Sequence, residues 1–302
     1  MSSKNIEMVL STLSYLKKLS GSNLLIKIGG SALTDLAEQK WIFEDIETIR
    51  SAGIGIVLVH GGGPMINAEL KSKGISWEFV DGQRVTTPQM MEVIEGVLYG
   101  TVNRHIVRGL NLAGVPAVGI SGIESSTLLC KPAGPKLGKV GEIHHVDTSL
   151  ITAILKTTNK DGLGTVPVIA PIGLSETGDT VNINADWVAS RVAQFLGIKK
   201  VIFITDQDGI LDSNGKVLSE LDASELENLI ESGKVTGGML TKTRTILSAL
   251  RSGVDAIHIV NAKRTHALVQ ELFTETGIGT VCRLRSTWTP NAIAETAPEV
   301  LP

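Results

Sequence analysis

Cysteine is scarce in this chain, and its two examples, Cys130 and Cys282, stand far apart in the sequence. Neither belongs to a Cys-x-x-Cys pair, so we expect neither a zinc site nor a framework of disulfide bonds. A chain with so few cysteines fits a reducing compartment, which favours the cytoplasm as its location.

An excess of positive charge is also lacking. The chain has 28 lysines and arginines against 31 aspartates and glutamates, and a formal net charge of −3. Nucleic acid is therefore a poor candidate for a partner. Small anionic ligands are not excluded, because backbone N–H groups and a few cations are enough to build an anion site.

Long apolar runs are missing as well. The first 21 residues include Lys4, Glu7, Lys17 and Lys18, so they do not read as a signal peptide. No later segment approaches the apolar length that a membrane span needs. We expect no membrane partner and a cytoplasmic protein.

Short apolar runs that alternate with helical patterns are what the chain does contain, over 302 residues of which 42% are hydrophobic. Runs this apolar are typical of strands with both faces covered, so we predict an α/β fold with an open, mainly parallel sheet of about eight strands between helices. Predicted strands are 24–28, 54–60, 116–120, 166–170, 200–205, 256–261 and 280–283, with a hairpin at 131–145. Predicted helices are 6–19, 42–52, 64–73, 88–112, 186–196, 223–232, 241–252 and 265–274.

Two glycine-rich turns follow the first two predicted strands. In the first turn, Lys27 lies one residue before the end of a predicted strand, and Gly29 and Gly30 follow that strand. In the second, His60 precedes three glycines, including Gly62 and Gly63, and a proline that suits a helix start. Glycines at these places let backbone N–H groups approach an anion closely. A plain turn with a solvated lysine is the simpler interpretation of the first motif, and we interpret His60 as structural.

Four later motifs carry polar residues at strand ends or helix starts. Arg84 lies in VDGQRVT, and an arginine can hold a carboxylate with two parallel hydrogen bonds, although taken alone it suggests a surface ion pair. Asn182 and Asp186 lie in NINAD, where a helix cap is the simpler interpretation. The other two motifs are an acidic turn and a glycine turn with a lysine in the first turn of the next helix, an arrangement that suggests a nearby anion. Their candidate residues are Asp206, Gly209, Ile210 and Leu211, and Gly237, Gly238 and Lys242.

In this order, the strings KIGGSAL, VHGGGPMI, VDGQRVT, NINAD, ITDQDGIL and GGMLTKT resemble the amino acid kinase family, and within it the N-acetylglutamate kinases. The resemblance covers about residues 24–284. It implies ATP-dependent phosphorylation of the side-chain carboxylate of N-acetyl-L-glutamate, a step of arginine biosynthesis. It also implies four segments, namely an N-terminal helix at 1–22 that could serve oligomerisation, a substrate lobe at 23–178, a nucleotide lobe at 179–285 and a tail at 286–302.

The resemblance also implies roles for the motif residues. Lys27 and Lys242 would stabilise the transferring phosphoryl group, and Asp186 would hold both lysines. The acylated amino acid would be bound by Gly62, Gly63, Arg84 and Asn182. The nucleotide would be bound by Gly29, Gly30, Asp206, Gly209, Ile210, Leu211, Gly237 and Gly238. The cofactors would be ATP and Mg²⁺, with magnesium bridging the β- and γ-phosphates and no side chain assigned as its ligand.

Some positions depart from the family pattern, among them Ile123, Trp187 and Trp77, and these leave the identity of the acid open. N-acetyl-2-aminoadipate and a carrier-linked aminoadipate are alternative substrates, other kinases of the family are alternative enzymes, and a non-catalytic ligand sensor is a third alternative. The N-terminal helix and the GIGT string resemble arginine-inhibited members, which implies a homo-oligomer, dimeric or hexameric. Arginine would then bind near His266, Glu271 and Gly279.

Overall fold

The computed structural model describes residues 12–13, 15–17, 19–160, 162–212, 214–274 and 277–284. Described residues between 12 and 19 are helical, as predicted for the end of the helix at 6–19. The earlier part of that helix and the predicted tail at 286–302 lie outside the described residues.

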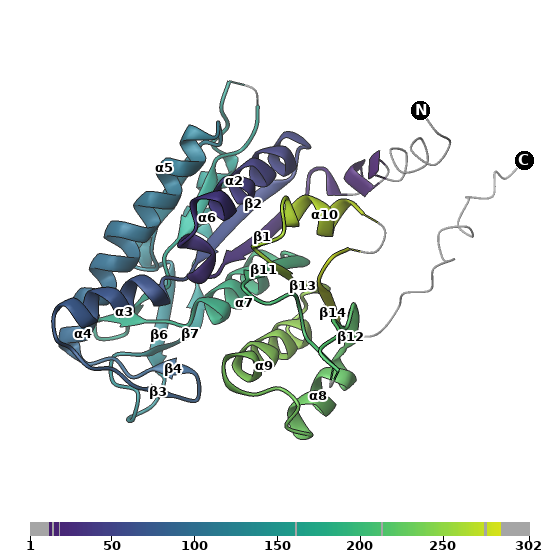
Figure 1. The fold of residues 1–302 in the computed structure, drawn as a ribbon. Helices are drawn as coiled ribbons and strands as arrows, with labels where there is room; N and C mark the ends of the chain where they lie inside the picture. Colours follow the sequence, from purple (N-terminus) through teal and green to yellow (C-terminus); the bar gives the residue numbers. More distant parts are fainter. Residues whose placement is uncertain are drawn as a thin grey trace, which may run out of the picture.

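A single eight-stranded sheet runs through the molecule and confirms the predicted α/β class (Figure 1). All neighbouring strands in it are parallel except the pair of β13 and β14. In sheet order the strands are β12 (Glu220–Asp222), β14 (Thr280–Arg283), β13 (Ala256–Asn261), β11 (Lys200–Thr205), β1 (Asn23–Ile28), β2 (Gly55–His60), β8 (Val166–Ile169) and β5 (Ala117–Ile120). The strands formed by residues 23–169 therefore meet those formed by residues 200–283 where β1 pairs with β11.

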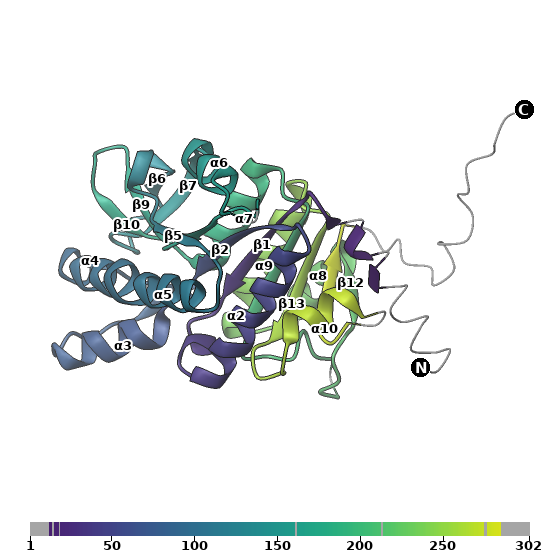
Figure 2. The same cartoon turned by 90° about the horizontal axis from the view of Figure 1, so that it is seen from above.

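Helices cover both faces of the sheet, which explains why its strands are apolar throughout. One face is covered by α2 (Leu36–Ser51), α3 (Gly63–Ser72), α4 (Pro88–Glu95), α5 (Arg104–Leu112) and α10 (Ala267–Phe273). Figure 2 shows α2, α5 and α10 on this face. The other is covered by α6 (Ser149–Lys156), α7 (Ala185–Leu196), α8 (Ala223–Glu231) and α9 (Gly237–Arg251). Of these helices, α6 was not predicted from the sequence.

The helix predicted at 88–112 is correct in extent but wrong as one regular helix. Between α4 and α5 the chain forms η2 (Gly96–Asn103), a π-helical segment with wider turns. Two short 3₁₀ turns, η1 (Ser31–Leu33) and η3 (Glu124–Ser126), also lie in this half of the chain.

A smaller sheet lies beside the β5 end of the main sheet, where Gly122 N donates to Ile172 O (Figure 2). Its strands β6 (Leu128–Pro132) and β7 (Gly141–Val146) are antiparallel and confirm the predicted hairpin. Its other strands, β9 (Ile172–Ser175) and β10 (Thr180–Asn182), were not predicted, and the lobe boundary predicted after residue 178 falls in the turn that joins them. A two-stranded ribbon of β3 (Phe79–Val80) and β4 (Gln83–Arg84) carries the predicted arginine.

Among the residues that the structure describes, no helix has both the length and the apolar character needed to cross a membrane.

Candidate active site

Lys27 owes its position to the alternation of side chains along β1. Leu24, Ile26 and Ile28 face the core under α2 and α10, whereas Leu25 faces the opposite core. Because successive side chains point to opposite faces of a strand, Lys27 lies on the side of Leu25, toward α7 and α9. It is 8% exposed and stands one residue from the carboxyl end of its strand.

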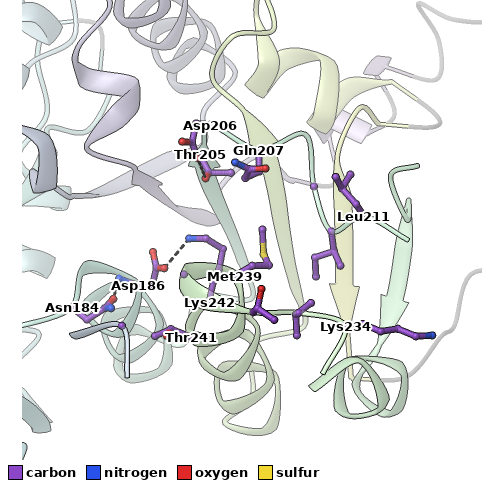
Figure 3. Close-up of a pocket in the computed structure, with 16 residues that line it drawn as sticks. Asn184, Asp186, Thr205, Asp206, Gln207, Leu211, Lys234, Met239, Thr241 and Lys242 are labelled. Carbon is purple, nitrogen blue, oxygen red and sulfur yellow. Dashed lines mark hydrogen bonds and ion pairs between the residues drawn. The ribbon is translucent and has the colours of Figure 1, made fainter. Parts of the chain in front are cut away.

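Asp186 and Lys242 reach the same point from two helices of that face. Asp186 lies in the first turn of α7, where the side chain of Asn184 accepts a hydrogen bond from its backbone N–H. Lys27 Nζ is 2.8 Å from Asp186 Oδ1, and Lys242 Nζ is 2.8 Å from Asp186 Oδ2. Figure 3 shows Lys242 pointing at Asp186, with a dashed line between the two side chains. The predicted convergence of Lys27, Asp186 and Lys242 is therefore what the structure has.

The charges of these three groups depend on one another because all three are buried. Burial by itself would raise the pKa of Asp186, but the charges of Lys242 and Lys27 hold it well below its usual range. Burial lowers the pKa of Lys27, the charge of Asp186 opposes that shift, and the charge of Lys242 adds to it. One carboxylate thus faces two cations, and the cluster carries an excess of positive charge that suits an anion.

The position of Lys242 in its helix differs from the prediction. Helix α9 begins at Gly237, so Lys242 lies in its second turn and not in the first. The glycines were interpreted as a turn before the helix, whereas Gly237, with a φ of 54°, and Gly238 open the helix itself. The anion inferred from this lysine is at least in part the Asp186 carboxylate.

Two cavities meet at the triad of Lys27, Asp186 and Lys242. The first, of about 570 Å³, lies over the ends of β11 and α9 (Figure 3). The second, of about 400 Å³, lies over the glycine turns after β1 and β2. Gly82, Asn184 and Asp186 line both cavities, so a group transferred from one cavity to the other would pass the two ammonium groups.

The predicted site residues divide between these cavities. The first is lined by Asp186, Asp206, Gly209, Ile210, Leu211, Gly238 and Lys242. The second is lined by Lys27, Gly30, Gly62, Gly63, Arg84, Asn182 and Asp186. Gly29 and Gly237 line neither cavity, and Gly30, which was predicted to bind nucleotide, lies with the predicted acid-binding residues. Gly29 instead donates its N–H to Ile204 O at 2.8 Å, where β1 runs beside β11.

The two glycine turns lie against each other at the floor of the second cavity. A Cβ atom at Gly30 would stand 2.8 Å from Gly63 N and 3.0 Å from Gly62 N. These nitrogens begin α3, where the first N–H groups of a helix have no carbonyl of the helix to bind. The absence of a side chain at residue 30 thus leaves room beside two backbone donors, as a bound anion requires.

Arg84 forms the far wall of the second cavity. Its guanidinium lies over the rings of Trp77 and Phe79, and its Nη2 donates to Asn67 Oδ1 at 2.5 Å. Its Nη1 is buried without a protein partner, and burial lowers the pKa of the group. Asn182 lines the same cavity and donates to Thr86 Oγ1 at 3.2 Å. The arrangement fits a carboxylate ligand, which would supply the missing partner of Nη1.

Several residues of the site were not singled out from the sequence. Asn67 orients Arg84, and Gly82 lines both cavities with its Cα beside Thr241, where a Cβ would stand 2.3 Å from Oγ1. Asn184 was visible as a helix cap but not as a cavity residue. These residues become functional candidates only because the fold brings distant segments of the chain together. No local sequence pattern predicts that contact.

The residues predicted to lie near an effector are partly engaged with one another. The Glu271 carboxylate pairs with His258 Nδ1 at 2.6 Å and accepts hydrogen bonds from the N–H groups of Ile278 and Gly279. His266 pairs instead with Asp45, at 2.7 Å.

Comparison with known proteins places the sequence in a family. Residues 23–261 match the sequence model of the amino acid kinase family. The chain belongs to the amino acid kinase family. It is 41% identical over 282 residues to an acetylglutamate kinase of Acidiphilium cryptum, covering 89% of this chain and 92% of that protein. It is 40% identical over 290 residues to an acetylglutamate kinase of Methanocaldococcus jannaschii, covering 91% and 95%.

Among solved structures, the N-acetylglutamate synthase of Neisseria gonorrhoeae, in complex with coenzyme A and N-acetylglutamate, superposes with a TM-score of 0.81 at 26% identity. The match covers 93% of this amino acid kinase chain but only 64% of the synthase.

Proposed function

We propose that this amino acid kinase phosphorylates the side-chain carboxylate of N-acetyl-L-glutamate with ATP, giving an acyl phosphate and ADP. The observation that carries the proposal is the pair of ammonium groups held 2.8 Å from one carboxylate where two cavities meet. The acetylglutamate kinases of about 40% identity over nine tenths of the chain support the choice of substrate. The reaction would belong to arginine biosynthesis.

The two cavities suggest how the reactants would be placed. The larger cavity, with Asp206, Gly209 and Leu211, would hold the nucleotide, and the smaller one, with Arg84 and Asn182, would hold the acid. We propose a substrate lobe at 23–178 and a nucleotide lobe at 179–285 to correspond to these cavities, with Asn182 and Asp186 of the second lobe reaching the acid cavity. Gly30, Gly62 and Gly63 would face the phosphoryl group between the two reactants. Gly29 and Gly237 line neither cavity and would only shape the backbone beside the nucleotide.

The chemistry requires positioning and charge neutralisation more than covalent catalysis. The acceptor carboxylate is already ionised at neutral pH, because the reference pKa of a glutamate side chain is about 4.3. No general base is therefore needed. An oxygen of the acid forms a bond to the γ-phosphorus while the bond to the bridging β–γ oxygen breaks, and ADP leaves with that oxygen. Lys27 and Lys242 would stabilise the charge on the transferred group.

Magnesium would accompany the nucleotide. Among the described residues that line the cavities, only Asp186 and Asp206 carry carboxylates, and the oxygens of Asp186 are already paired with lysines. The described residues also contain no group of three acidic, histidine or cysteine side chains able to hold a metal ion. Among the contacts of the described residues, Asp206 accepts a hydrogen bond only from Thr205 Oγ1, and one such carboxylate together with phosphate oxygens fits the usual magnesium site of kinases. Asp206 would hold the ion, whose charge would neutralise the phosphates.

A panel of acids tested with ATP and hydroxylamine examines the proposal directly. Hydroxylamine converts an acyl phosphate into a stable hydroxamate, so the assay reports both the reaction type and the accepted acid. We expect hydroxamate with N-acetyl-L-glutamate and little with free glutamate, aspartate or carbamate. A preference for N-acetyl-2-aminoadipate would move the proposal to that acid. No ADP release with any acid would favour a ligand sensor and overturn it.

We also propose a homo-oligomer, dimeric or hexameric, that responds to arginine. The described end of the N-terminal helix packs on the end of α10, with the rings of Tyr15 and Phe273 6.3 Å apart, and α10 also carries Glu271 and begins after His266. A ligand or a neighbouring subunit at this helix could therefore act on α10. Sedimentation of a chain without residues 1–20, with and without arginine, tests this, and an unchanged size and inhibition would contradict it.

A further inference from the structure

The π-helical segment η2 lies directly behind the glycine turn that follows β2. A Cβ at Gly62 would stand 2.6 Å from Leu98 Cδ2 and 3.5 Å from Val102 Cγ2, so both side chains close around the turn. Asn103, the last residue of η2, is fully buried. In an α-helix, residues three and four apart share a face. Hydrogen bonds between residues five apart in a π-helix bring position 103 toward the face of position 98 as well.

Asn103 connects this segment to the histidine of the glycine motif. Its Nδ2 donates to Val168 O at 2.8 Å and lies 3.2 Å from His60 Nε2. His60 is also fully buried, and its Nδ1 lies 2.9 Å from Gly61 O. Because an amide nitrogen can only donate, His60 Nε2 must accept and Nδ1 must donate to Gly61. Burial lowers the pKa of His60 to about 4, so the ring stays in this neutral form at pH 7.

The bond to Gly61 O has a consequence for the next residue. The carbonyl of Gly61 and the N–H of Gly62 belong to one planar peptide unit and point in opposite directions. Fixing the carbonyl oxygen therefore fixes the direction of the Gly62 N–H. That nitrogen lies beside the space left by the missing side chain of Gly30, in the cavity that Lys27 also lines.

We propose that His60 and Asn103 are positioning residues for phosphoryl transfer, which hold the peptide between Gly61 and Gly62 so that its N–H faces the transferred group. Neither side chain lines either of the two cavities, so they act through the glycine turn and not on the reactants. The inference rests on the proposed kinase function and deepens it. It also explains why an otherwise regular helix contains π turns at this place.

Gly119 on β5 offers a second way to disturb the hydrogen bond between Asn103 and His60. A Cβ there would stand 1.8 Å from Asn103 Oδ1 and 2.8 Å from Arg104 Nη2, so an alanine would displace the Asn103 amide without removing it. Asn103 Oδ1 is itself buried without a hydrogen-bond partner, and it lies against this glycine. Gly119→Ala should therefore resemble a substitution of Asn103.

The test measures kcat, KM for each substrate and the Kd of ADP for His60→Leu, Asn103→Leu, Gly119→Ala, the double Leu variant and His60→Asn. Because a misplaced group costs up to about 10²-fold in rate, we expect the Leu and Ala variants to lose roughly 10- to 100-fold in kcat. The Kd of ADP should stay unchanged. The double variant should lose no more than the worse single one, since both act on one bond. His60→Asn should recover most of kcat, because an asparagine Nδ2 can take the place of the imidazole Nδ1.

Gln39→Leu is the matched control. Gln39 is another buried amide that bonds both a backbone carbonyl, Leu33 O at 2.9 Å, and a histidine, His105 at 2.6 Å, away from both catalytic cavities. It should leave kcat unchanged. The inference is overturned if the folded His60, Asn103 and Gly119 variants behave like Gln39→Leu, or if His60→Asn is no better than His60→Leu. If a Leu variant does not fold, the kcat values of Gly119→Ala and His60→Asn decide instead. The inference then requires a reduced kcat in Gly119→Ala and a kcat close to the wild type in His60→Asn. A wild-type protein that phosphorylates no acid overturns the proposed function instead, which separates the two failures.

Discussion

Asp186 is the residue on which the arrangement of the two ammonium groups depends. Its pKa is lowered in the folded chain, so the stability that its charge contributes is complete above its unfolded pKa of about 3.9 and is lost as the pH falls through the lower folded value. At neutral pH this charge holds both lysines. Replacing it leaves two buried cations without a counter-charge, which costs about 3–5 kcal/mol for a broken buried pair.

Asp186→Asn should therefore lower both the unfolding temperature and kcat. The loss of the carboxylate also makes Lys27 easier to deprotonate, since the charge of Asp186 raises the pKa of that group. We expect the decline of activity at alkaline pH to begin at a lower pH than in the wild type. Asp255→Asn, at an exposed ion pair with Lys199, is the control and should leave the unfolding temperature, kcat and the alkaline limb unchanged. An alkaline limb at its wild-type position in Asp186→Asn would contradict the assigned role.

At the scale of elements, α2 caps the N-terminus of α10 with a side chain far away in sequence. Asp45, 1% exposed, accepts hydrogen bonds from Leu268 N at 3.0 Å and Val269 N at 3.4 Å, and pairs with His266. Cap residues are worth about 0.5–2 kcal/mol, and a buried donor left without a partner adds to the loss. This contact ties a helix of the first half of the chain to one of the second.

Asp45→Ala should lower the free energy of unfolding by about 2 kcal/mol or more, because it leaves buried N–H groups without an acceptor. Asp45→Asn keeps one acceptor oxygen and should lose less. The matched control is Asp35→Ala, which removes the exposed cap of α2, where Asp35 Oδ1 accepts from Ala37 N at 2.7 Å, and should cost about 1 kcal/mol. Urea unfolding of the three variants measures these differences. Equal losses for Asp45→Ala and Asp35→Ala would contradict the account of the cap.

Elements also show where the sequence was informative. Seven of the eight strands of the main sheet were predicted because apolar runs mark them, as in β1 and β11, whereas the edge strand β12 was missed. Strands of two or three residues, such as β3 and β10, were missed because they are defined by their partners and not by a pattern. The π turns of η2 were missed because its residues read as ordinary helix formers. The start of α9 was placed late because glycines were interpreted as a break.

At the scale of the whole molecule, the strand order explains how the site is built. The β1–β11 contact brings the two halves of the chain together at the centre of the sheet, so Lys27 pairs in register with Phe203, and Lys242 Nζ lies 5.2 Å from the centre of that ring. The resemblance to a family predicted that Lys27, Asp186 and Lys242 converge, but no pattern in the sequence alone places residues 27 and 242 together. The same contact between the two parts of the chain places Gly82 and Asn184 where they line both cavities.

Single-turnover phosphoryl transfer in Lys27→Ala and Lys242→Ala tests the central claim most directly. The enzyme in excess over labelled ATP is mixed with N-acetyl-L-glutamate and hydroxylamine, and the rate of hydroxamate formation is compared with the Kd of ATP. Removing a group that stabilises developing charge typically costs about 10²–10³-fold in rate, so we predict a loss of this size in each variant with a much smaller change in Kd. A wild-type rate of transfer in either variant would contradict the account.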